Sequence, residues 1–233
     1  FKIRYLQIIY FVYNVSKHSL HKRTCMTSVK VSGQIRRRQI VDATLKIISE
    51  KGVKNLTTAA IANEVGMSEA NLYRHFVNKE EILRETVPMI GEGLHSNIEK
   101  VFRSHKNPLV CLREIYALHL GFVGNNAGIP RLVFSEEIHG GNSTLKEIMF
   151  NTVKGYAAKL ESLLREGQVA GLIEKDLDPA CCALTIIGMV QVTILRWSLS
   201  GFTFSLKKEG LNLWNNFEKC LVTKDRLNRE GSH

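Results

Sequence analysis

Residues 57–76 read TTAAIANEVGMSEANLYRHF, and this stretch decides the fold. Thr57 and Ser68 stand where helix N-caps are expected, because a hydroxyl there accepts hydrogen bonds from amides that the first helical turn leaves unpaired. Gly66 lies between them and fits a turn with a left-handed backbone. We therefore predict a short helix after Thr57, a glycine turn, and a second helix over residues 69–75. This spacing is typical of a helix-turn-helix.

The second predicted helix carries a dense set of polar side chains that can donate hydrogen bonds. Asn71, Tyr73, Arg74 and His75 lie on one short element, and Lys79 follows it. A solvated helix more often mixes acids with bases, whereas a surface that faces DNA phosphates needs donors. An ordinary helical hairpin would show the same caps and glycine, so these side chains favour DNA binding.

Residues from about 35 to 83 resemble the DNA-binding domain of the tetracycline-repressor (TetR) family. The matching runs are RRRQIVDATLKIISEKG and LTTAAIANEVGMSEANLYRHFVNKEEIL, of which LYRHF and NKEEIL are the most specific parts. The resemblance implies an all-α protein. Its N-terminal three-helix helix-turn-helix domain would be followed by a C-terminal helical domain for ligand binding and dimerisation.

In the TetR-like picture, the residues of the helix-turn-helix divide into those that hold phosphates and those that read bases. Arg36 and Arg37 precede the apolar face of the first helix and are predicted to contact a phosphate or the minor groove. Further phosphate contacts are predicted for Thr57, Thr58, Tyr73, His75 and Lys79. Base contacts are predicted for Ser68, Glu69, Ala70, Asn71 and Arg74, with Asn71 suited to adenine and Arg74 to guanine. Leu72 and Phe76 are expected to pack inside the domain.

Length and composition suit a helical protein with a polyanionic partner. The chain has 233 residues, 44% of them hydrophobic and 23% charged, as is ordinary for a soluble globular protein. Its net charge of +10 favours a nucleic acid as partner but does not require one. The cysteines at positions 25, 111, 181, 182 and 220 include no Cys-x-x-Cys pair, so buried free thiols are expected.

We predict four segments along the chain. Residues 1–30 form an extension that is not expected to belong to the fold, with Met26 as the natural start. The helix-turn-helix domain spans residues 31–78. The helical effector-binding and dimerisation domain spans residues 79–225, and residues 226–233 form a tail that resembles a tag remnant.

Beyond residue 78, apolar residues at helical spacing predict several further helices. One begins after the cap Asn78 and continues through Pro88; the others span residues 108–123, 130–139, 143–170, 180–195 and 206–221. The helix at 180–195 is apolar nearly all round, although it is short for a membrane span. Such a helix in a soluble protein is buried by its own core and often by a second subunit. We place a homodimer interface on the last two helices and expect no membrane contact.

The resemblance also implies a small-molecule effector bound in the C-terminal domain, although the sequence does not identify it. Candidate lining residues, for each of which plain core packing is the alternative, are His119, Phe122, Phe134, His139, Phe150 and Trp197. Glu136, Glu137 and His139 have a generic spacing, so neither a metal site nor a cofactor is predicted.

The expected function is that of a cytoplasmic, ligand-released transcriptional repressor that binds a palindromic operator as a dimer. Two reading heads related by a dyad, about 34–36 Å apart or a multiple of it, would read successive major grooves. A nucleoid-associated or architectural DNA-binding protein is the alternative. An enzyme on a helical scaffold is a remote alternative, because the chain contains no Gly-x-Ser-x-Gly, phosphate-binding glycine loop or His-Glu-x-x-His.

Overall fold

The computed structural model describes residues 32–140 and 143–223, and the elements below all belong to one compact unit, Gly33–His233. The predictions for residues 1–30 and 226–233 concern segments outside the described residues. The described part of the chain is helical apart from one isolated bridge between Ile173 and Val222. The predicted all-α class is therefore confirmed.

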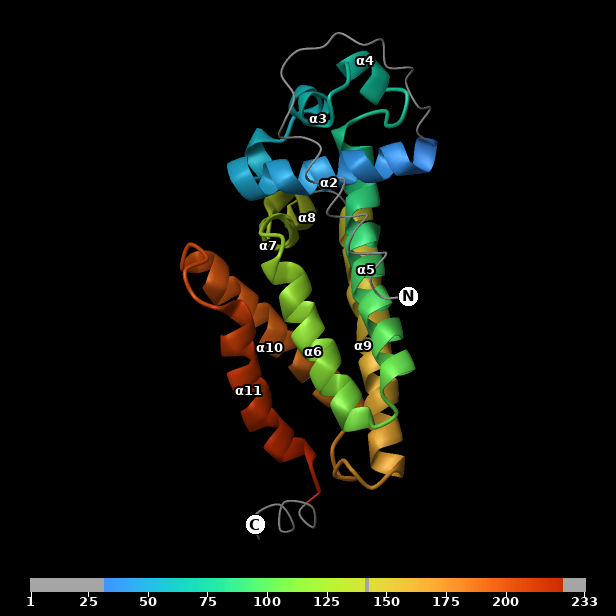
Figure 1. Cartoon of the computed structure of the whole chain (residues 1–233), viewed down its shortest axis with the longest axis vertical. Helices are drawn as coiled ribbons and strands as arrows, with labels where there is room; N and C mark the ends of the chain where they lie inside the picture. The colour runs from blue at the N-terminus through green and yellow to red at the C-terminus, as the bar shows by residue number, and fades with distance from the viewer. Residues whose placement is uncertain (1–31, 141–142, 224–233) are drawn as a thin grey trace, which may run out of the picture. The chain divides into compact units, whose positions relative to one another are not determined.

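The N-terminal helices form a helix-turn-helix domain (Figure 1). Its elements are α2 (Gly33–Lys51), the 3-10 turn η1 (Val53–Asn55), α3 (Thr58–Val65) and α4 (Glu69–Leu72). Thr57 caps α3 by accepting from the Ala60 amide at 3.1 Å, and Ser68 caps α4 by accepting from the Asn71 amide at 3.2 Å. Gly66 has a φ of 72°, the left-handed conformation that its position predicted.

The second helix of this pair is shorter than predicted. Regular α-helix ends at Leu72, and residues 73–75 continue as a turn in which the His75 amide donates to the Leu72 carbonyl at 2.8 Å. Phe76 follows the turn and is only 1% exposed. The chain leaves the helical path here so that this ring reaches the core. We call α4 together with residues 73–75 the recognition segment.

The C-terminal helices pack around an apolar core that is continuous with the core of the helix-turn-helix domain. They are α5 (Lys79–Ser104), α6 (Pro108–Gly124), α7 (Gly128–Val133), α8 (Glu136–His139), α9 (Ser143–Val169), α10 (Pro179–Leu199) and α11 (Leu206–Leu221). The long helices α5, α6 and α10 all pack on α9, and α11 packs on α6 and α10 (Figure 1). The predicted helix over residues 130–139 is in fact two short helices, α7 and α8. Ser135 separates them, because its hydroxyl donates to the Leu132 carbonyl at 2.7 Å and closes the first helix.

Helix α7 lies directly against α2 of the helix-turn-helix domain. A Cβ atom placed on Gly128 would lie 2.1 Å from the Leu45 carbonyl oxygen, so only glycine allows this approach. Three residues on, the Arg131 guanidinium donates to the Ile48 carbonyl at 3.4 Å. The C-terminal domain therefore contacts the carbonyl groups of α2 through the backbone at Gly128 and the side chain of Arg131.

Helix α10 is long and apolar enough, by length and composition, to cross a membrane. It packs against α9, α11, α6 and α7, and its inner face includes the buried residues Ile186, Val190 and Ile194. The core helix of a soluble protein passes the same composition test, so this helix is weak support for a membrane span.

Only two of the four cysteines in the described part of the chain are buried. Cys111 and Cys182 are buried free cysteines, as predicted, whereas Cys181 and Cys220 are exposed. The prediction of burial was wrong for these two, since they lie on the faces of α10 and α11 that point away from the core. Cys25 lies outside the described residues.

Candidate nucleic-acid interface

The recognition segment separates its apolar side chains from its polar ones. Leu72 is 0% exposed and packs inside, as predicted for it and for Phe76. Tyr73 is 48% exposed, and Arg74 is exposed beside it. The predicted base readers also lie in exposed positions: Ser68, Glu69, Ala70, Asn71 and Arg74. The segment therefore presents an outward surface of donors and acceptors.

Glu69 is held between the two helices of the motif. The Thr58 hydroxyl donates to Glu69 Oε1, and the Tyr73 hydroxyl lies 3.4 Å from the same oxygen. The two hydroxyls are themselves 3.3 Å apart. Two predicted phosphate-binding residues thus orient a carboxylate on the outward surface, at the N-terminal end of α4.

The remaining predicted phosphate-binding residues flank this surface. Thr57 is exposed as the cap of α3, while His75 and Lys79 are half-buried after α4. Arg36 is half-buried and borders an open surface depression between α2 and α3. These positions are compatible with contacts to a duplex laid across the recognition segment.

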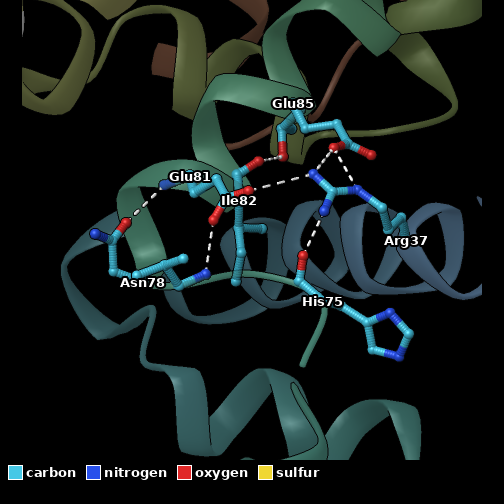
Figure 2. Close-up of polar contacts among 8 residues, drawn as sticks. Arg37, His75, Asn78, Glu81, Ile82 and Glu85 are labelled. Carbon is cyan, nitrogen blue, oxygen red and sulfur yellow. Dashed lines mark hydrogen bonds and ion pairs between the residues drawn. The ribbon is translucent and has the colours of Figure 1, made fainter. Parts of the chain in front are cut away.

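Arg37 differs, because its guanidinium is engaged within the protein (Figure 2). Its Nε donates to Glu85 Oε2 at 2.7 Å, its Nη2 donates to the same oxygen, and its Nη1 donates to the His75 carbonyl. Glu81 adds an ion pair at 3.5 Å. The hydrogen bond with Glu85 raises the pKa of the Arg37 guanidinium above its usual value. These contacts hold the Arg37 side chain within the domain.

The C-terminal domain contains an apolar cavity of about 90 Å³ between α5, α6, α7, α9 and α10. Most of its wall is aliphatic. Representative lining residues are Val87, Ile90 and Leu94 from α5, Val153 from α9, and Ile187 and Val190 from α10. Its composition suits a molecule with an apolar body.

A few polar groups border this cavity. His119 Nδ1 and the Tyr156 hydroxyl lie 3.2 Å apart, and Thr152 and Gln191 also contribute to the wall. Burial lowers the pKa of His119 to about 4, so its imidazole is neutral near pH 7, and burial raises the pKa of Tyr156. A neutral histidine and a phenol can exchange hydrogen bonds with a polar group of a ligand without a charge cost.

Two of the six predicted lining residues, His119 and Phe134, line this cavity. The other four do not line this cavity. Phe122 covers the Gly93 position on α5, and Phe150 is 68% exposed to solvent. His139 bonds a backbone carbonyl of α7 at the surface, and Trp197 stacks edge-on against an aromatic ring after α10. Aromatic and histidine side chains were predicted to line the cavity, whereas its wall consists mainly of aliphatic ones.

Comparison with family models identifies the class of protein. Residues 40–86 match the model of bacterial regulatory proteins of the tetR family, and residues 91–217 match the C-terminal region of YsiA-like protein. Together the two matches cover the helix-turn-helix and most of the domain that holds the cavity. The chain belongs to the TetR family, and it is a DNA-binding regulator.

Several known proteins are similar over most of the chain. The nucleoid occlusion factor SlmA of Marinomonas sp. (strain MWYL1) is 27% identical over 194 residues, which are 83% of this chain and 96% of that protein. SlmA of Vibrio cholerae is 29% identical over 170 residues, 72% of this chain and 87% of that protein.

Solved structures share the fold. The transcriptional regulator FadR from Bacillus subtilis, in complex with stearoyl-CoA, has a TM-score of 0.66 and 24% identity, over 80% of this chain and 97% of that chain. SmeT, the repressor of the Stenotrophomonas maltophilia multidrug efflux pump SmeDEF, has a TM-score of 0.66 and 18% identity. The match covers 84% of this chain and 92% of that chain.

Proposed function

We propose that this regulator is a ligand-released transcriptional repressor, without catalytic activity, that acts in the cytoplasm on a palindromic operator as a homodimer. The observation that carries the proposal is the outward surface of the recognition segment. Asn71 and Arg74 are exposed there and have the donors that suit adenine and guanine edges. Tyr73 and Lys79 flank them as phosphate contacts.

An exposed stripe on α10 supports pairing of two copies. The exposed large apolar residues of this helix are Leu184, Val192, Leu195 and Leu199, which follow one another at helical spacing. Gly188 lies on the same stripe, with no atom within 4 Å of the position that its Cβ would take. Another helix can therefore approach closely at this point. A two-fold bundle of α10 and α11 from both copies would cover the stripe.

The cavity supports an effector with an apolar body and a small polar group. Its aliphatic wall would hold the apolar body, and the His119–Tyr156 pair would meet the polar group. The stearoyl-CoA bound by FadR makes fatty acyl thioesters the first class to test. To release DNA, the effector must bind the DNA-free conformation more tightly than the DNA-bound one.

In vitro selection from random duplex DNA tests this function. We expect one palindromic sequence to be recovered, bound by two copies of the chain. Stearoyl-CoA and shorter acyl-CoA molecules should weaken the complex in a mobility-shift titration, and free coenzyme A serves as the control. Recovery of DNA without sequence preference, or binding of the operator by a single copy, would contradict the proposal.

A nucleoid-associated or architectural DNA-binding protein is the second candidate, and the similarity to the nucleoid occlusion factor SlmA over 83% of the chain favours it. This role uses the same recognition segment but a different distribution of binding sites. Genome-wide footprinting separates the two. A local repressor occupies one or a few promoters, whereas an architectural protein occupies many dispersed sites outside promoters.

A further inference from the structure

Three segments of the DNA-binding region meet at one side chain, Arg37 (Figure 2). Arg37 comes from α2, the His75 carbonyl from the recognition segment, and Glu81 and Glu85 from the first two turns of α5. The guanidinium also lies 3.9 Å from the centroid of the Phe76 ring. We call these five residues the Arg37 clamp.

The acidic side of the clamp also fixes the link between the recognition segment and α5. One carboxylate oxygen of Glu81 faces Arg37, and the other accepts from the Val77 amide at 2.6 Å. Asn78 caps α5 by accepting from the Glu81 amide at 2.9 Å (Figure 2). Val77 and Asn78, which lead into α5, are therefore both bonded to Glu81, Val77 to its carboxylate and Asn78 to its backbone amide.

The geometry of the guanidinium makes this a positional constraint. Its fork is planar and rigid, so it cannot follow a shift of one partner without weakening its bonds to the others. The His75 carbonyl closes the recognition segment, where a helical end leaves carbonyls without partners. Arg37 supplies the donor for this carbonyl and sets its position relative to Glu85.

We infer that Arg37 is a positioning residue that sets the placement of the recognition segment on α5, and thereby operator specificity, without contacting DNA itself. This inference rests on the proposed operator binding. It replaces the phosphate or minor-groove contact that the sequence predicted for the same residue. Loss of a phosphate contact lowers the salt dependence of binding, whereas loss of a positioning residue leaves it unchanged.

The test compares five variants by fluorescence anisotropy over a range of salt concentrations. The DNA is the operator selected with the wild-type protein, together with an unrelated duplex of equal length. Arg37→Gln, Glu85→Gln and the charge-conserving double variant R37Q/E85Q break the clamp. The controls are Lys79→Gln, which removes a predicted phosphate contact, and Glu92→Gln, which neutralises an exposed acid on the same helix.

Glu85→Gln gives the sharpest result, because it removes a negative charge from a DNA-binding domain. Simple electrostatics predicts tighter binding to all DNA. The clamp predicts instead that the operator is bound about tenfold more weakly, whereas unrelated DNA is not bound more weakly. A tenfold loss of affinity is comparable to the loss of one charged hydrogen bond. Glu92→Gln should leave the ratio of operator to unrelated affinity unchanged, and R37Q/E85Q should lower this ratio at unchanged net charge.

The salt slope separates positioning from phosphate contact. Each phosphate contact contributes about 0.9 to the slope of log affinity against log salt, so losing it from both subunits of a dimer lowers the slope by about 1.8. Lys79→Gln should show this loss, and R37Q/E85Q should keep the wild-type slope.

Operator binding by Glu85→Gln at wild-type strength or better, or a slope loss in R37Q/E85Q equal to that of Lys79→Gln, overturns the inference alone. Failure of the wild type to select any operator overturns the proposed function and this inference with it. Circular dichroism and thermal unfolding establish that each variant is folded. Should Arg37→Gln not fold, Glu85→Gln decides, since it leaves the Arg37 bond to the His75 carbonyl available.

Discussion

Glu69 brings a negative charge to a surface that otherwise consists largely of donors. Its carboxylate is oriented by the hydroxyls of Thr58 and Tyr73, so its oxygens have a defined direction before DNA arrives. A carboxylate repels phosphates but accepts a hydrogen bond from an exocyclic amino group, above all that of cytosine. We therefore expect Glu69 to select a base and to weaken binding elsewhere.

Glu69→Gln tests this expectation. One base pair in each half-site should lose its preference, which is worth about 1–3 kcal/mol in a good side-chain–base pair, while affinity for unrelated DNA rises. Repeating the selection with the variant measures the first effect, and a salt titration measures the second. Glu64→Gln is the control, because this exposed acid on α3 pairs with Lys46 instead. An unchanged selected sequence would remove Glu69 from the base readers.

As phosphate contacts, Tyr73 and Lys79 should each add affinity for any DNA sequence. Replacing either by alanine is expected to weaken binding to operator and unrelated DNA alike, and to lower the salt slope for Lys79 by about 0.9 per contact. Anisotropy titrations at several salt concentrations give both quantities. Unchanged affinity in both variants would mean that the recognition segment lies differently on the duplex.

At the scale of the helices, local signals were predictable from the sequence. Thr57, Ser68 and Asn78 all cap the helices that they were predicted to begin. A cap depends on a hydrogen bond spanning two or three residues, so neighbouring residues carry the information. The end of α4 was not predicted, because it depends on the packing of Phe76 in the core. This packing is a tertiary contact that neighbouring residues do not reveal.

The long-range partners could not be predicted in the same way. Arg37 and Glu85 are 48 positions apart, and a charge in a sequence does not tell a DNA contact from an ion pair. The cavity could not be predicted for the same reason. Its wall is assembled from five helices that are distant in the sequence, and each helix contributes only one of its faces. Phe122 was predicted to line it, but a rotation about the axis of α6 decides between the cavity and Gly93.

The contact between α7 and α2 leads to a prediction for Gly128. Alanine at this position would place its Cβ 2.1 Å from the Leu45 carbonyl oxygen, so the two helices must separate. We expect a loss of about 1–3 kcal/mol of folding free energy and a weaker operator complex. Gly121→Ala in α6 is the matched control, because nothing lies within 4 Å of its Cβ position. Equal melting temperatures for both variants would contradict the tight contact.

The apolar stripe on α10 leads to a prediction for Leu195. Aspartate there would place charges at the centre of the proposed two-fold bundle, so the protein should sediment as a monomer and lose operator affinity. Phe150→Asp changes an apolar residue that is 68% exposed on α9 and should leave the dimer intact. A Leu195→Asp variant that still sediments as a dimer would exclude this stripe as the interface.

At the scale of the whole molecule, the sequence predicted the two-domain helical organisation. The burial of His119 adds a dependence of the free energy of unfolding on pH. Its half-buried side chain borders the cavity, and burial lowers the pKa of its imidazole from 6.5 to about 4. Between these values the unfolded chain binds a proton that the folded chain does not. Its contribution to the free energy of unfolding is therefore fully present above pH 6.5 and is lost as the pH falls toward 4.

His119→Gln should remove this dependence. The difference between wild type and variant is expected to shrink by at most about 3 kcal/mol between pH 7 and pH 4, the equivalent of the pKa shift. Urea unfolding at several pH values measures it, and taking the difference cancels the other titrating groups. A difference that does not change with pH would show that the imidazole is hydrated in the folded protein.

Helix α5 carries both the acids that hold Arg37 and three residues of the cavity wall, Val87, Ile90 and Leu94. Glu85 and Leu94 are separated by only about 14 Å along one continuous rod. In a biosensor built from this chain, substitutions on α5 are therefore expected to alter two properties together: the set of ligands that the cavity binds, and the transcription from the promoter in the absence of ligand. Changes on the opposite walls, such as at Met149 or Ile187, offer a way to retune the ligand while leaving the basal signal alone.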